Sequence, residues 1–92
     1  MIDVDHAYEL DPQVALRPER FGALAYHYGT RRLVFIKAGL LAVLERLPAS
    51  ASLGAAFEQA DIPHARWAAF VRALTSLEQS GVLRAKVAAP HG

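Results

Sequence analysis

The sequence contains no cysteine. This absence excludes disulfide bonds, thiolate metal sites and an iron–sulfur cluster held by the chain's own thiolates. It also fits a reducing compartment, and we expect a cytoplasmic protein. The start of the chain, Met1 to Asp5, has no basic region followed by an apolar one, which argues against a secretory signal peptide. The longest apolar stretch, residues 38–44, is too short to cross a bilayer.

Catalytic and metal-binding patterns are also missing. The histidines, His6, His27, His64 and His91, form no close helical pair with each other or with a carboxylate. The glycines are dispersed and match no nucleotide-binding loop, and no serine has the surroundings of a nucleophile. We therefore expect no native metal, no organic cofactor and no enzymatic activity. The histidines are interpreted as solvated, with His27 as a hydrogen-bonded strand residue.

Length and composition predict one folded domain. The chain has 92 residues, of which 53% are hydrophobic and 21% charged, enough for a modest core. We expect residues 1–92 to form a single domain whose ends, residues 1–11 and 88–92, are flexible. The net charge of +1 does not indicate binding to a polyanion or to a membrane surface.

Three segments in the first half have the composition of β-strands. Residues 14–17 end at Pro18, residues 21–28 are rich in aromatic side chains, and residues 33–36 are mostly β-branched or aromatic. A tight turn at Gly29-Thr30 predicts a hairpin between the second and third segments. These signals predict a three-stranded antiparallel sheet with the third strand at an edge.

Three helices are predicted in the second half, where the apolar spacing changes to three and four residues. The first ends at Pro48, the second begins at Ser50 or Ser52, and the third runs from about Pro63 to Gly81. The apolar positions of the third helix are Trp67, Phe70, Val71, Leu74 and Leu77. Three strands followed by three helices predict an α+β domain that resembles a winged helix.

The third predicted strand, Leu33-Val34-Phe35-Ile36, is apolar at every position. A strand with one solvated face should alternate apolar and polar side chains, so both faces of this strand need a cover. One interpretation, slightly favoured by the pattern alone, is that helices cover both faces. The other is that a partner strand adds at the open edge and sends side chains into a groove beside the third helix. Trp67 and Phe70 are then either core residues or binding anchors.

DNA binding is the alternative function for a winged-helix arrangement. Arg31 and Arg32 lie at the predicted hairpin tip, where a wing would contact phosphates. The third helix, however, offers only Arg66 and Arg72 as cations, with Glu78 opposing them, which is few for a recognition helix. The arginine pair is equally compatible with a solvated turn that discourages aggregation. We therefore expect no nucleic-acid partner.

A resemblance to a known family favours the peptide-binding interpretation. It is carried by Asp11-Pro12-Gln13-Val14-Ala15-Leu16-Arg17-Pro18-Glu19, Phe21-Gly22-Ala23-Leu24, Tyr26-His27, and Gly29-Thr30-Arg31-Arg32-Leu33 with Phe35 and Lys37. These residues resemble the peptide chaperone family of mycofactocin biosynthesis, within the broader PqqD-like family of precursor-peptide recognition elements. The rest of the chain is similar mainly in its helix pattern. Asp11 stands where the family pattern has histidine, and Arg20 where it has a second proline, which puts local turn geometry in doubt.

The resemblance implies a PqqD-type fold of three antiparallel strands followed by three helices. It implies that the leader of a ribosomally made precursor peptide adds as a strand to the third strand, against the third helix. A radical S-adenosylmethionine maturase would then modify that peptide, and its iron–sulfur chemistry would belong to this partner. Carried over by position, the peptide-binding residues are Leu33, Val34, Phe35, Ile36, Trp67, Phe70, Val71 and Leu74.

The open third-strand edge has two further consequences. Without peptide, it can pair with a second copy of the chain, which predicts a homodimer through this strand. In an antiparallel strand, successive residues point their N–H and C=O groups to alternate sides. Either Leu33 with Phe35 or Val34 with Ile36 therefore faces outward, and the sequence leaves this choice open.

Overall fold

The computed structural model describes residues 2–86 and contains two small sheets and three α-helices. The elements are β1 (Tyr8–Leu10), β2 (Val14–Glu19), β3 (Gly22–His27), β4 (Leu33–Lys37), α1 (Ala38–Arg46), the short 3-10 helix η1 (Leu47–Ala49), α2 (Leu53–Gln59), α3 (His64–Gln79) and β5 (Leu83–Ala85). The predicted α+β fold, with three antiparallel strands followed by three helices, is confirmed. The short strands β1 and β5 are additional.

The larger sheet has the order β2-β3-β4, and both pairings are antiparallel. The prediction that Pro18 ends the first of these strands is wrong, because β2 continues to Glu19. Tyr28 donates its N–H to the Gln13 carbonyl, so by alternation Pro18 directs its nitrogen away from β3. A proline is tolerated at such a position because no ladder hydrogen bond is lost.

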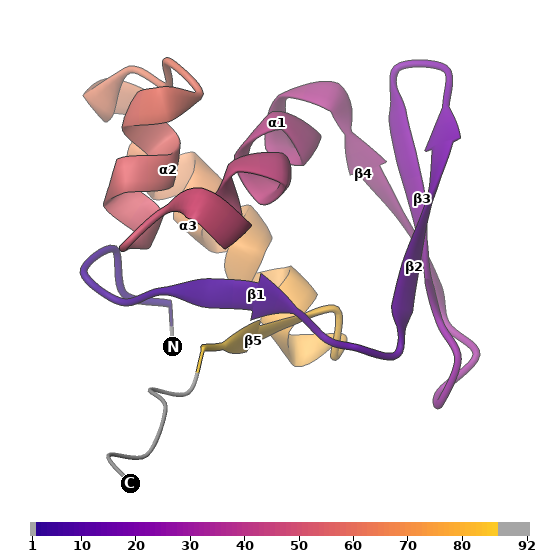
Figure 1. The fold of residues 1–92 in the computed structure, drawn as a ribbon. Coiled ribbons are helices and arrows are strands. Elements are labelled where there is room, and N and C mark those ends of the chain that lie inside the picture. Colours follow the sequence, from indigo (N-terminus) through magenta and orange to yellow (C-terminus); the bar gives the residue numbers. More distant parts are fainter. Residues whose placement is uncertain (1, 87–92) are drawn as a thin grey trace, which may run out of the picture.

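The smaller sheet joins the two ends of the described chain. Strand β1 pairs with β5 (Figure 1). Next to this pairing, Asp11 donates its N–H to the Val82 carbonyl at 2.9 Å. Ile2 and Tyr8 are buried, and the Tyr8 hydroxyl accepts a hydrogen bond from the Asp3 N–H. Residues 2–11 are thus packed against the rest of the domain, and the expectation that residues 1–11 are flexible stays a prediction. The counterpart expectation, for residues 88–92, lies outside the described residues.

All three helices lie on one side of the larger sheet (Figure 1). The core between them contains Ile36, Val43, Leu53, Phe57 and Leu74, which are fully buried. On the opposite face of the sheet, the side chains of Leu33 and Phe35 are 64% and 50% exposed. The interpretation in which helices cover both faces of this strand is therefore wrong.

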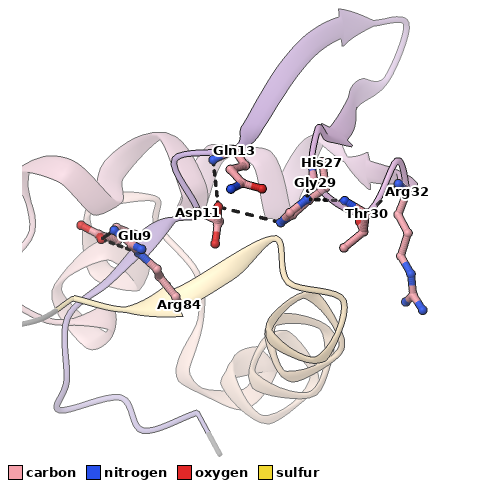
Figure 2. Close-up of polar contacts among 8 residues, drawn as sticks. All are labelled: Glu9, Asp11, Gln13, His27, Gly29, Thr30, Arg32 and Arg84. Atoms are coloured by element: carbon pink, nitrogen blue, oxygen red, sulfur yellow. Dashed lines mark hydrogen bonds and ion pairs between the residues drawn. The ribbon is translucent and has the colours of Figure 1, made fainter.

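His27, at the end of β3, is buried and organises the turn between β3 and β4. Its Nδ1 accepts hydrogen bonds from the N–H groups of Gly29 and Thr30, both at 3.1 Å (Figure 2). Because Nδ1 accepts, the ring proton is assigned to Nε2, which lies 3.8 Å from Oδ1 of Asp11. The same carboxylate oxygen accepts the N–H of Gln13. The interpretation of His27 as a hydrogen-bonded strand residue is confirmed.

Replacing His27 with leucine should lower the free energy of unfolding by about 1–3 kcal/mol, because two turn N–H groups lose their acceptor. His27→Asn should retain part of this stability, since an asparagine oxygen can accept the N–H two residues further along the chain. Urea denaturation of the three proteins measures the difference. A leucine variant as stable as the parent would show that the ring does not hold the turn.

Candidate peptide-binding site

Hydrogen bonds at the two ends of the β3–β4 pairing determine which backbone groups of β4 are free. His27 donates its N–H to the Arg32 carbonyl at 3.0 Å, and Ala38 donates its N–H to the Phe21 carbonyl at 2.9 Å. Both bonds belong to the register in which Ala25 opposes Val34. By alternation, the even-numbered residues of β4 bond to β3 and the odd-numbered ones point outward.

The outward set is therefore Leu33, Phe35 and Lys37, which answers the parity question left open by the sequence. Strand β4 is an edge strand, since β3 is its only partner in the described sheet. Leu33, Phe35 and Lys37 thus offer their N–H and C=O groups to an additional strand. Their side chains lie on the exposed face, whereas Ile36 is buried beneath the helices.

An apolar groove lies beside this edge. Its cavity of about 590 Å³ is bounded by β4, the first turn of α1 and one face of α3. The lining residues are Val34, Phe35, Lys37, Gly39, Leu40, Arg66, Ala69, Phe70, Ala73, Ser76 and Leu77. A strand added to β4 would therefore have its backbone at the edge and every second side chain directed toward α3.

The residues predicted to bind peptide fall into three groups. Val34, Phe35 and Phe70 line the groove, and Leu33 is exposed at the edge. Ile36 and Leu74 are fully buried in the core, and Val71 packs against that core. Trp67 lies with its ring 5.0 Å from that of Phe57 and donates its Nε1 hydrogen to the Ile62 carbonyl.

A second row of residues on α3, which the apolar spacing did not single out, lines the groove. The predicted stripe of large apolar side chains faces mainly the core, whereas the groove row is Arg66, Ala69, Phe70, Ala73, Ser76 and Leu77. Helical spacing of three and four residues relates the members of both rows. The available signal was the small size of Ala69 and Ala73, because small residues leave space between a helix and a neighbouring strand.

Phe70 forms one wall of the groove in a defined position. Its ring meets that of Phe57 edge-on at 5.9 Å, and the Arg66 guanidinium lies 5.6 Å from its centre. A Cβ added at Gly39 would lie 3.8 Å from the Phe70 ring, which places this wall beside the start of α1. The edge, α1 and α3 therefore meet at the Lys37 end of the groove.

Residues 2–86 offer neither a metal site nor a membrane-spanning helix. No group of three or more histidine, cysteine, aspartate or glutamate side chains is placed to hold a metal ion there. No helix in this part of the chain is both long and apolar enough to cross a membrane.

A small α+β domain with an open strand edge beside an apolar groove has the geometry of a peptide-binding module. The sequence profile of the peptide chaperone MftB family matches residues 7–84, and the chain belongs to this family. It is 40% identical over 82 residues to a peptide chaperone MftB of Mycobacterium tuberculosis (strain ATCC 25618 / H37Rv), covering 88% of this chain and 75% of the relative. The protein is thus a peptide chaperone, and the family resemblance seen in the sequence is confirmed.

Two further relatives agree with this assignment. The peptide chaperone MftB of Mycobacterium ulcerans (strain Agy99) is 40% identical over 82 residues, which cover 88% of this chain and 75% of that protein. The peptide chaperone MftB of Mycolicibacterium smegmatis (strain ATCC 700084 / mc(2)155) is 39% identical, with coverage of 88% and 80%. The comparison with solved structures found no match. None of these findings supports the DNA-binding alternative.

Proline substitution in β4 should distinguish the N–H groups that bond to β3 from those that point outward. Val34→Pro removes an N–H that bonds to β3 and should cost about 1–3 kcal/mol more than Val34→Ala. Phe35→Pro removes an outward N–H and should be about as stable as Phe35→Ala. Thermal or urea unfolding of the four variants measures both differences. The parity assignment fails if Phe35→Pro is the variant that unfolds.

Proposed function

We propose that this chain binds the leader of a ribosomally made precursor peptide as an added strand on β4. It then presents that peptide to a radical S-adenosylmethionine maturase in mycofactocin biosynthesis. The observation that carries the proposal is the free backbone of Leu33, Phe35 and Lys37 beside the α3 groove. Membership of the peptide chaperone MftB family supports it.

The strand edge and the groove would make different contributions to the binding of a leader peptide. Main-chain hydrogen bonds to the edge supply affinity without reading side chains, and the groove reads alternate side chains for specificity. Val34 and Phe70 offer apolar contacts at the groove, while Ala69 and Ala73 leave room for the peptide's own side chains. The core residues Ile36 and Leu74 would act indirectly, by supporting the strand and the helix.

The proposed role is non-catalytic and cytoplasmic. The chain has no cysteine with which to hold an iron–sulfur cluster, so the radical chemistry would be that of the partner enzyme. The purified chain alone should therefore leave the precursor peptide unmodified.

The affinity for the leader should depend on the outward N–H groups of β4. Leu33→Pro and Phe35→Pro should each weaken leader binding by about 1 kcal/mol, roughly fivefold, relative to the alanine variants at the same positions. Isothermal titration with the leader of the cognate precursor peptide measures this. Proline variants that fold and bind as the alanine variants do would place the peptide elsewhere.

Filling the groove should also block the peptide. Ala69→Tyr places a large ring in the groove, whereas Ala68→Tyr adds the same ring at an exposed α3 position that does not line it. The first should weaken leader binding at least tenfold, about 1.4 kcal/mol, and the second should leave it within about twofold. Equal effects of the two variants would contradict a peptide seated against α3.

A homodimer through β4 should compete with the peptide, because both use the same backbone groups. Light scattering over a concentration series should show a dimer whose fraction falls when leader peptide is added to saturation. Phe35→Pro should weaken self-association as well. A dimer that persists at saturating peptide would have its contact on another surface.

A further inference from the structure

The charges of this chain are unevenly divided between the sheet and the rest of the protein. Residues 14–37, which form β2, β3 and β4, contain five arginines and lysines and one glutamate, a net charge of +4. The remaining residues contain five cations and eight acids, a net charge of −3. The total of +1 therefore conceals a cationic sheet, and the proposed peptide edge belongs to it.

The groove beside this edge is also cationic. Lys37 and Arg66 line it, and no aspartate or glutamate does. Neither cation has a carboxylate within ion-pair distance among residues 2–86. The Arg66 guanidinium is positioned over the Phe70 ring, and Phe70 in turn lies beside Gly39, two residues after Lys37. Both cations thus belong to the end of the groove where β4 passes into α1.

We propose that this end of the groove binds a carboxylate side chain, so that the ligand class is an acidic, extended peptide. This inference rests on the proposed leader binding and specifies its chemistry. Arg66 would hold the carboxylate, and the apolar wall of Val34 and Phe70 would take neighbouring side chains. Lys37, whose side chain lies on the other face of β4, would add positive charge at the same end of the edge. Charge complementarity supports an acidic ligand, because the groove cations and the wider sheet have the same sign.

Strand geometry predicts the spacing in that peptide. A residue opposite a β4 residue in an added strand directs its side chain to the same face of the sheet. Peptide residues opposite Val34 and Ile36 therefore face α3, and these should be apolar. The next residue on the same face lies two positions further along, beside the Lys37 end, and this residue should be Asp or Glu. The recognised pattern is two apolar residues and one acid, each separated by one residue.

The test uses the synthetic leader of the cognate precursor peptide and a version in which every Asp and Glu is replaced by Asn or Gln. The parent protein should bind the amide version at least tenfold more weakly. Arg66→Gln should weaken binding of the acidic leader roughly three- to tenfold, and Lys37→Gln should weaken it less, by about twofold. Neither should much affect the amide version. Arg72→Gln is the matched control, because Arg72 is an exposed α3 cation outside the groove.

Two more variants separate charge from packing. Arg66→Lys keeps the charge but loses the planar group over Phe70, so it should bind the acidic leader more tightly than Arg66→Gln but more weakly than the parent. Arg66→Glu should bind poorly, and a leader whose groove-facing acid is changed to lysine should restore its binding. Circular dichroism melts confirm that each variant is folded.

The outcomes distinguish the inference from the function on which it rests. The acidic-ligand proposal alone is overturned under the following result. The parent protein binds the leader and Phe35→Pro lowers that affinity, but neither amide substitution nor the Lys37 and Arg66 variants change it. A leader that does not bind at all, or is insensitive to Phe35→Pro, overturns strand addition and this inference together. A further outcome is that the protein binds a 20-base-pair DNA duplex more tightly than the leader, with an affinity that Arg66→Gln reduces. That result would assign the cations to a nucleic acid and also overturn the proposal.

Discussion

The burial of Ile36 against the helices is the constraint on which the arrangement of the binding edge depends. Strand side chains alternate between faces, and strand backbone groups alternate between neighbours with the same period of two. Once Ile36 faces the core and bonds to β3, Phe35 must expose its side chain and direct its backbone outward. A shift of one residue would place Phe35 in the core and turn the backbone groups of Val34 and Ile36 outward instead, so core packing determines which residues present the free edge groups.

Close pairing of β3 with β4 is a second requirement for this register. A Cβ at Gly22 would clash with the carbonyl oxygen of Ile36, so the start of β3 can approach β4 only as glycine. At the other end of the pairing, the buried ring of His27 holds the turn by accepting two N–H groups. The edge strand is therefore anchored at both ends, whereas its outer side has no partner in the described structure. Such anchoring would lower the ordering cost of adding a peptide strand.

Helix α3 serves the core and the groove with two adjacent rows of side chains. Leu74 and Leu77 are buried in the core, while Ala69 and Ala73 leave the space that becomes the groove. Arg66, in the first turn of the helix, brings a positive charge to the same surface. An open edge beside a groove is suited to reversible binding of a peptide.

The sequence alone was sufficient for the α+β class, for the three central strands and three helices, and for the family, because short-range periodicity and a contiguous run of residues carry those signals. It could not predict the pairing of β1 with β5, since three-residue strands have almost no local signal and form through contacts between the two ends of the described chain. Of the predicted binding residues, sequence reasoning placed Val34, Phe35 and Phe70 at the groove but could not separate the core row of α3 from the groove row. Both rows have helical spacing, so only the tertiary packing of α3 on the sheet decided that Arg66 and Ala69 face the open edge.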